Sequence, residues 1–345
     1  MKLLAYADVQ ATETGGRCYH DPTESLQTWR VRKFFTDLSK IYSHYGCDGL
    51  LDLGDTTDDR TAIPIITIDT ILAGLDLFPR SPNNIKLIGN HEQTLKSTHV
   101  HVGRLFSQHF RVVPVRDVIH LGGRPVICVS YHYDDNDTEQ WLVKETRRNH
   151  NSLVLGHLQV KGCHMNSGTA IGGLSKEAFS KTALGLLGHV HAPQSVLPHV
   201  HYVGSPFQQD FSEANETKRV AIVDLDSMSV TWVALDGFPT YHTISLSEFL
   251  KAPAQDESEN RFNVVLEKVD ELETLMAHPR FYMVNEIIHG FKGEDQKKES
   301  NVAIGITPRQ LMAEYLIKVP ATTRGIELPT DELIDLGLEI ASGTT

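Results

Sequence analysis

Side chains that can bind a metal follow a series of short apolar segments in the first 200 residues. Each segment ends at a glycine or an alanine, and a carboxylate, an amide or an imidazole comes directly after it. These candidate residues are Asp8, Gln10, Asp55, Asn90, His91, His157, His189 and His191. Histidine is also frequent, with 18 in 345 residues. Because imidazole is the commonest metal ligand in proteins, the pattern predicts metal chemistry.

The mixture of ligand types restricts which metal and which reaction fit. Carboxylate, amide oxygen and imidazole together suit Mn²⁺, Fe or Zn²⁺ better than Ca²⁺, which prefers oxygen ligands alone. Seven or eight ligands are too many for one tetrahedral ion, and they fit two ions that share a bridging carboxylate. Two ions about 3.5–4 Å apart are the usual clamp for in-line displacement at phosphorus. The residues therefore predict a dinuclear phosphoester hydrolase.

Short apolar runs predict the strands that must position these residues. We expect strands at 2–7, 49–53, 84–88, 152–155 and 184–187, helices at 26–45, 63–78 and 138–148, and a strand hairpin at 118–121 and 125–130. Strands that alternate with helices predict an α/β sandwich with helices on its outer faces. Ligands gather at the carboxyl ends of strands in such sheets, so residues far apart in the sequence can converge there.

The rest of the chain predicts two further parts. Strands expected at 196–202 and 219–233 continue a second sheet, and the first domain is predicted to span 1–250. After a polar linker, residues 262–290 mix strand and helix patterns, as a small α+β cap for DNA recognition would. Residues 305–345 then predict a C-terminal helical segment, with Pro308 in the first turn of its first helix.

Composition excludes several classes of protein. The chain is 40% hydrophobic and 22% charged, which is typical of a globular protein, and 32 basic against 44 acidic residues give a net charge of −12. Such a chain does not coat nucleic acid through bulk charge, although bound cations can offset the repulsion. Four widely spaced cysteines indicate neither a disulfide framework nor a cysteine zinc site. With no apolar run of about 18 residues and no signal peptide, we expect no membrane association and a cytoplasmic location.

The order of the motifs resembles that of the calcineurin-like metallophosphoesterase superfamily, whose pattern is DxH, GD, GNH[DE], a lone His and GHxH. This chain reads ADVQ, LGDTTDD, GNHE, LGHLQ and LGHVH. The resemblance implies a double β-sandwich flanked by helices, with His91 as a catalytic residue beside the scissile phosphate. It also implies two sets of metal ligands that share a bridging Asp55. The first ion would be held by Asp8, Gln10, Asp55 and His191, and the second by Asp55, Asn90, His157 and His189.

A second stretch narrows the resemblance. Residues 201–213 (HYVGSPFQQDFSE) are similar to a stretch of the SbcD-type nucleases, the nuclease subunit of double-strand-break repair, and the length fits a compact phage version. This similarity implies a Mn²⁺-dependent DNA exonuclease or endonuclease that acts in repair, recombination or DNA degradation. It also implies an SMC-like ATPase of the SbcC type as a partner, docked on the helices at 305–345. A homodimer is compatible with it.

Two positions depart from the SbcD pattern. Gln10 replaces the usual histidine, and a neutral amide oxygen should weaken the first metal site and favour Mn²⁺ over softer ions. Asp58 stands where these nucleases often carry a histidine. An ionised acid cannot donate a hydrogen bond to phosphate, so we expect a different cleavage preference.

Two alternatives remain open at this point. A Ser/Thr-type phosphoprotein phosphatase or a dinucleotide hydrolase would share GDTTDDR and GNHE, although Arg60 lies one place late for the phosphatase motif. A non-catalytic scaffold would retain the fold and bind a partner, but it should have lost several ligands, and only Gln10 departs here. Hydrolysis of a diester but not of a monoester would favour the nuclease over the first alternative. Metal analysis of the purified protein would distinguish the nuclease from the scaffold.

Overall fold

The computed structural model describes residues 1–13, 24–94, 100–165, 168–170, 172–251, 260–268 and 271–289. The chain divides into two compact units, Met1–Phe238 and Pro239–Thr345. The first unit thus ends before residue 250, the end expected from the sequence. Residues 241–251 belong to the second unit because strand β15 (Tyr241–Ser245) pairs with β16 (Arg261–Leu266) there.

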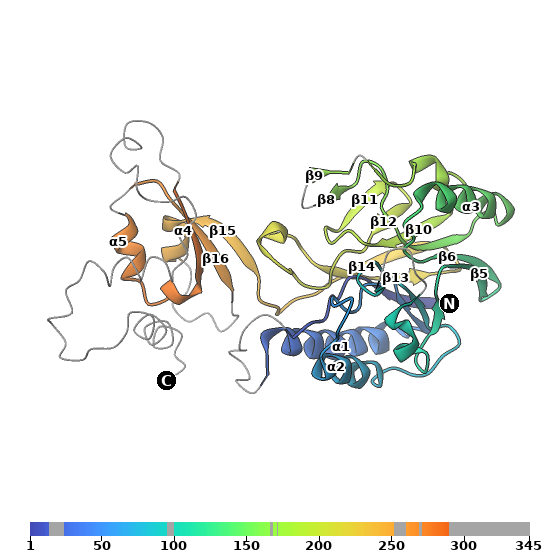
Figure 1. Cartoon of the computed structure of the whole chain (residues 1–345), viewed down its shortest axis with the longest axis horizontal. Coiled ribbons are helices and arrows are strands. Elements are labelled where there is room, and N and C mark those ends of the chain that lie inside the picture. The colour runs from blue at the N-terminus through green and yellow to red at the C-terminus, as the bar shows by residue number, and fades with distance from the viewer. Residues whose placement is uncertain are drawn as a thin grey trace. The chain divides into compact units, whose positions relative to one another are not determined.

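The first unit contains two six-stranded sheets (Figure 1). In spatial order, the first sheet consists of β14 (Ser229–Ala234), β13 (Arg219–Asp224), β1 (Lys2–Tyr6), β2 (Gly49–Asp52), β3 (Ile85–Leu87) and β4 (Arg111–Val113). The second consists of β11 (Gln194–Leu197), β12 (Val200–Tyr202), β10 (Leu184–Gly188), β7 (Leu153–His157), β6 (Arg124–Val129) and β5 (Arg116–Leu121). A short ribbon joins β8 (His164–Met165) to β9 (Gly168–Thr169).

The direction of the strands brings together the strand ends that the candidate metal ligands follow. Strands β1 to β4 run parallel, and so do β6, β7, β10 and β12. The hairpin between β5 and β6 turns at Gly122 and Gly123, whose φ values of 53° and 79° need residues without a Cβ. Because parallel strands share one carboxyl edge, each sheet gathers the residues that follow its strands at that edge.

Three apolar layers stabilise the first unit. Successive side chains of a strand point to opposite faces of its sheet, so neighbouring residues belong to different layers. Leu3 and Ala5 of β1 pack between the sheets, with Cys128 of β6 in the same layer. Leu4 and Tyr6 face the opposite way and pack against helix residues such as Phe34. A third layer covers the outer face of the second sheet. Figure 1 shows α1 and α2 beside one sheet and α3 beside the other. This arrangement confirms the expected α/β sandwich flanked by helices.

Local signals set the helix ends. Helix α1 (Leu26–Tyr45) has the predicted bounds, since Ser25 caps its first turn and Gly46 ends it in the left-handed conformation. Helix α2 (Ile65–Leu75) is shorter than predicted, because Pro64 precedes it as the cap. Helix α3 (Asp135–Arg148) begins earlier than predicted, because the Asp134 side chain accepts a hydrogen bond from the Asp137 amide. Single 3₁₀ turns occur at η1 (Val102–Phe106), η2 (Lys176–Phe179) and η3 (Phe211–Glu213).

The second unit is a small α+β fold. Strands β15, β16 and β17 (Val284–His289) form a parallel sheet in that order. Its other elements are α4 (Leu246–Lys251), α5 (Glu271–Met276) and η4 (Phe281–Met283), and its core includes Phe249, Phe262, Val264, Leu275 and Ile287. The segment 305–345, predicted as a helical docking segment, lies outside the described residues. Among the helices that the structure describes, none has the length and apolar character needed to cross a membrane.

A charged side chain is completely buried in the first sheet. Lys86 of β3 has no exposed area, and its Nζ lies 2.8 Å from Asp52 Oδ2 and 2.7 Å from Glu92 Oε1. Burial opposes its charge, but the two carboxylates outweigh that effect and raise the pKa of Lys86. A buried cation between two acids is costly to disturb, since removing it leaves uncompensated charge in the core.

We expect Lys86→Met to lower the free energy of unfolding by about 3–5 kcal/mol, the usual effect of breaking a buried ion pair. The control is Lys40→Met, because Lys40 also pairs with an acid, Asp37, but is 70% exposed. The control should lose less than about 1 kcal/mol. Urea unfolding followed by circular dichroism measures both. Equal losses of unfolding free energy in the two variants would show that the buried ion pairs of Lys86 stabilise the protein no more than an exposed ion pair does.

Candidate metal centre

All eight candidate residues lie at the carboxyl ends of strands that meet at one edge of the sandwich. Asp8 and Gln10 follow β1, Asp55 follows β2, Asn90 and His91 follow β3, His157 ends β7, and His189 and His191 follow β10. Hydrogen bonds join these strand ends within and between the sheets. The Asp8 amide donates to Gly54 O at 3.0 Å within the first sheet, and the His189 amide, from the second sheet, donates to Asp8 Oδ1 at 3.0 Å.

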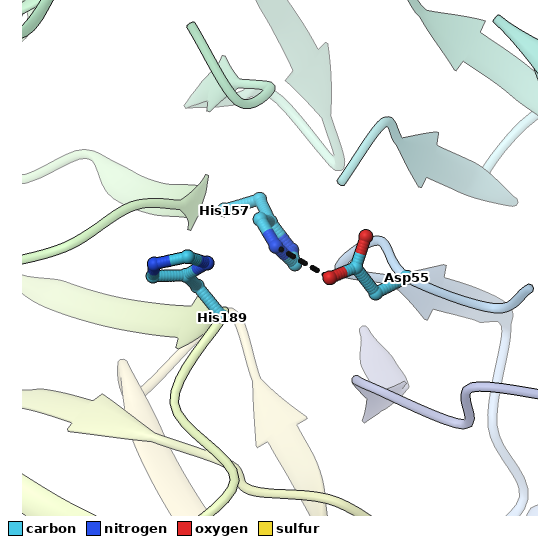
Figure 2. A group of neighbouring side chains, drawn as sticks. All are labelled: Asp55, His157 and His189. Carbon is cyan, nitrogen blue, oxygen red and sulfur yellow. Dashed lines mark ion pairs between the residues drawn. The ribbon is translucent and has the colours of Figure 1, made fainter. Parts of the chain in front are cut away.

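Three of these residues form a compact ligand group. Asp55, His157 and His189 each offer an atom, and these atoms lie within 4.8 Å of one another. Figure 2 shows the two imidazoles and the carboxylate turned toward a common point, with His157 Nε2 at 3.2 Å from Asp55 Oδ2. Asn90 completes the group, because its Oδ1 lies 3.1 Å from His157 Nε2 and 2.7 Å from His189 Nδ1.

The hydrogen bonds of His157 indicate which of its ring nitrogens faces this point with a lone pair. Its Nδ1 lies 2.8 Å from the carbonyl oxygen of Leu53, which can only accept, so Nδ1 carries a proton. In the neutral ring, Nε2 therefore directs a lone pair toward the oxygens of Asp55 and Asn90. Burial opposes a second proton, but the Asp55 carboxylate outweighs it and raises the pKa of His157 to about 9. A divalent ion would compete with that proton for the same nitrogen.

Buried negative charge also fits a cation at this edge. Asp8 is 0% exposed and Asp55 is 1% exposed, and in the described part of the chain neither forms an ion pair with lysine or arginine. Burial raises the pKa of Asp8 to about 6. Burial, together with the charge of His157, lowers the pKa of His189 to about 3, which leaves a neutral imidazole able to ligate. Because buried charge is costly unless it is paired, the donor set fits divalent ions.

The remaining predicted ligands form a second arrangement beside the first. His191 Nε2 lies 3.0 Å from the side-chain amide of Gln10, and its Nδ1 lies 2.7 Å from Glu213 Oε1. A carboxylate only accepts, so Nδ1 carries the proton and Nε2 is left for the site. The amide nitrogen of Gln10 faces this ring, and rotation of the amide would present its oxygen instead.

Glu213 is a functional residue to which the sequence analysis assigned no role. It is completely buried and accepts hydrogen bonds from Ser205 Oγ at 3.0 Å and from the Gln209 amide at 3.0 Å. Lys218 Nζ pairs with the same oxygen, Oε2, at 2.7 Å, whereas Oε1 faces His191. The GSP…FSE stretch thus has a structural purpose, which is to hold the carboxylate that orients His191. The FSE motif was the available signal.

Glu92 connects the loops after β2 and β3. Its carboxylate accepts from the amides of Asp55 and Thr56, both at 3.2 Å, and from the Gly89 amide at 3.0 Å. The loops also approach very closely at Gly89, where an added Cβ would lie 1.9 Å from Asp55 Oδ1. Any side chain at residue 89 would therefore displace the Asp55 carboxylate.

His91 is placed differently from the ligand group. It is partly exposed, its amide donates to Asp55 Oδ1 at 2.8 Å, and its Nδ1 lies 2.7 Å from Asp58 Oδ1. The Asp58 hydrogen bond raises the pKa of His91. Asp58 was considered from the sequence only for its effect on phosphate, and the structure shows it as the partner of His91.

The backbone at the site is held in an unfavourable conformation. Seven residues other than glycine have positive φ in the part that the structure describes, and four of them are predicted ligands. Those four are Asp8 (55°), Gln10 (46°), Asp55 (55°) and His189 (88°). Such conformations cost energy and concentrate at functional sites, so their coincidence with the predicted ligands supports a site here.

No family model and no curated protein matches this chain. Among solved structures, an archaeal phosphodiesterase is 10% identical, with 68% of this chain and 100% of that chain covered and a TM-score of 0.35. A putative 5′-nucleotidase from Staphylococcus aureus is 14% identical (68% and 52% covered, TM-score 0.41), and a dimetal phosphatase from Danio rerio is 12% identical (64% and 95% covered, TM-score 0.40). At these TM-scores the matches do not define a function, which is argued below from the side chains.

We expect Glu213→Gln to weaken the binding of the first divalent ion about 10- to 100-fold, because an amide no longer fixes the ring of His191 as the carboxylate does. Glu216→Gln is the matched control, since Glu216 also pairs with Lys218 and, in the part of the chain that the structure describes, forms no hydrogen bond or ion pair with the site histidines. Isothermal titration with Mn²⁺ measures both variants. Equal affinity in Glu213→Gln and the wild type would contradict the assigned role.

Proposed function

We propose that this chain is a metal-dependent phosphodiesterase, and specifically a Mn²⁺-dependent DNA nuclease of the SbcD type. The observation that carries the proposal is the convergence of Asp55, Asn90, His157 and His189 on one point, with His91 beside it. Two divalent ions, when bound, supply activation of water and neutralisation of charge on the phosphoryl group. The chain's own residues hold those ions, orient the phosphate and provide a proton.

The proposed ligand sets follow the two arrangements at the strand ends. Asp8, Gln10, Asp55 and His191 would hold the first ion, and Asp55, Asn90, His157 and His189 the second. Asp55 belongs to both sets and contacts a member of each: its Oδ2 lies 3.2 Å from His157 Nε2, and its backbone oxygen accepts from the Gln10 amide at 2.9 Å. The mixed oxygen and nitrogen ligands fit Mn²⁺, Fe or Zn²⁺, and the neutral amide oxygen of Gln10 favours Mn²⁺ among them.

His91 would act on the phosphate and not on the metal. Asp58 accepts the Nδ1 proton, which fixes the ring and favours the charged imidazole. The Nε2–H can then donate to a phosphoryl oxygen or pass its proton to the leaving oxygen. After transfer, the ring recovers a proton from solvent, because His91 is partly exposed.

The choice of DNA as substrate rests on residues 201–213. This stretch resembles SbcD-type nucleases, and here its Glu213 orients a proposed ligand. A net charge of −12 opposes binding of a polyanion, so local neutralisation by the two ions would be needed.

A Ser/Thr-type phosphatase or dinucleotide hydrolase is the second candidate, and the contact between Asp58 and His91 favours it. Asp58 is the last acid of GDTTD, the part of the sequence that resembles the phosphatase motif. The distinguishing experiment offers the purified chain linear and hairpin DNA with Mn²⁺, Mg²⁺ or EDTA. In parallel, the chain is offered bis-p-nitrophenyl phosphate and the corresponding monoester. Cleavage of DNA and of the diester supports the nuclease, hydrolysis of the monoester alone supports the phosphatase, and absence of both metal and activity indicates a scaffold.

We expect His91→Asn to lower DNA cleavage about 10²- to 10⁴-fold, because a general acid contributes on this order. Mn²⁺ content should be retained, since the ring contacts Asp58 and is not a proposed ligand. The control is His132→Asn, a partly exposed histidine on a neighbouring loop, which should keep its activity. Metal analysis and initial rates are the measurements, and loss of a metal equivalent in His91→Asn would falsify the assignment.

The ATPase partner is proposed from the sequence alone. Residues 305–345 carry apolar side chains at helical spacing, including Leu311, Tyr315, Leu333 and Leu336, and short apolar helices need a covering surface. We propose that this segment docks an SMC-like ATPase by helix-in-groove recognition.

We expect truncation after Ser300 to leave Mn²⁺-dependent cleavage of short single-stranded DNA intact, because every proposed ligand lies in Met1–Phe238. ATP-stimulated processing of duplex ends should be lost. Co-purification with the ATPase and end processing are measured together. A truncated chain that still binds the ATPase would place the docking surface elsewhere.

A further inference from the structure

Strand β6 reaches the same edge as the ligand-bearing strands, but no function has been assigned to the residues that follow it. It runs parallel to β7, with Val129 paired to Gly156, the residue before His157. The next residues, Ser130 and Tyr131, therefore leave the sheet beside the metal centre. By the same rule that places the ligands, this position should face the site.

The backbone at Tyr131 is fixed to the loop that carries Asn90 and His91. The Tyr131 amide donates to Ile88 O at 2.8 Å, and Gln93 Nε2 donates to Tyr131 O at 2.9 Å. The buried Ser130 hydroxyl donates to Val113 O at 2.6 Å and accepts from the Ile88 amide at 2.8 Å. These bonds leave the Tyr131 backbone little freedom, so its ring emerges from a rigid base.

The ring itself lies against both histidines of the second ligand set. Its centroid is 5.9 Å from that of His189, with 33° between the planes, and 6.4 Å from that of His157, with 79° between the planes. His157 is completely buried, whereas Tyr131 and His189 are partly exposed. Within the described residues, no group hydrogen-bonds to the Tyr131 hydroxyl. The ring therefore lies at the edge of the candidate metal centre. No hydrogen bond of its hydroxyl within the described residues accounts for a tyrosine at this position.

We propose that Tyr131 is a substrate-binding residue whose ring stacks on the base of the nucleotide next to the scissile phosphate. This inference rests on the proposed nuclease function and names how that site holds its substrate. Asn90 and His91 are also partly exposed, and the bond from the Tyr131 amide to Ile88 O holds the ring beside their loop, so a phosphate at His91 would have its flanking nucleotide near the ring. Stacking on an aromatic side chain accepts any base, because every base has a π face.

The test compares a short single-stranded oligodeoxynucleotide with an abasic one of equal length, which has the same phosphodiesters and no bases. The preference of the full-length wild type for the base-bearing strand is expressed as a ratio of kcat/KM values. Tyr131→Ala should lower this ratio about 5- to 150-fold, as expected for a stack of about 1–3 kcal/mol at about 1.4 kcal/mol per tenfold. Tyr131→Phe should retain the ratio, because the ring does the stacking.

Tyr133→Ala is the matched control, because Tyr133 belongs to the same loop, is 59% exposed and has no ring contact with the site histidines. Its ratio should equal that of the wild type. If Tyr131→Ala loses activity equally on both strands, or loses bound Mn²⁺, then the ring only supports the histidines and the inference is wrong. If Tyr131→Phe behaves like Tyr131→Ala, stacking is excluded. A wild type that cleaves neither strand but hydrolyses a phosphomonoester overturns the nuclease proposal itself, which is a distinct result.

Discussion

Carboxylates with almost no solvent exposure, among them those of Asp8, Asp55 and Glu92, lie where β1, β2 and β3 end. Each must be neutralised or solvated by the protein, since water does not reach it. Glu92 is satisfied by Lys86 and by three backbone amides. Among the described residues, Asp55 and Asp8 pair with no lysine or arginine, and they receive hydrogen bonds from backbone amides and the charge of imidazoles. A divalent ion bound there would replace the proton on His157 and neutralise the two carboxylates.

The histidines around this charge are oriented by one common device. His91, His157 and His191 each use Nδ1 toward an oxygen acceptor, provided by Asp58, by Leu53 O and by Glu213 respectively. In each ring Nε2 is then left for the site. Fixing one nitrogen sets both the tautomer and the ring plane, so geometry and chemistry are determined together. The acceptors differ in charge: the two carboxylates favour imidazolium, whereas a carbonyl oxygen does so less strongly.

The sequence predicted the parts of this site that depend on local pattern. Apolar runs followed by Gly and a polar residue located β2, β3, β7 and β10, and the shared edge followed from strand direction. The supporting residues were not predictable in the same way. Glu213 reaches His191 only because the loop through Ser205 folds back, and Asp58 meets His91 across two loops. Residues 241–251 fall in the second unit because β15 pairs in parallel with β16, and such pairing leaves no local signal in the sequence.

The exposure of the site residues is uneven, and this has a consequence for how a polyanion could bind. Asp8, Asp55 and His157 form a buried floor, whereas Asn90, His91 and His189 are partly exposed, so substrate must approach over the latter. Without ions, the floor presents negative charge to a phosphate, in a chain whose net charge is −12. Divalent ions in the proposed sites would make the local charge positive. Metal binding and substrate binding are then coupled, and by linkage each must strengthen the other to the same degree. A weak first site containing Gln10 would on this account be tightened by the bound phosphodiester.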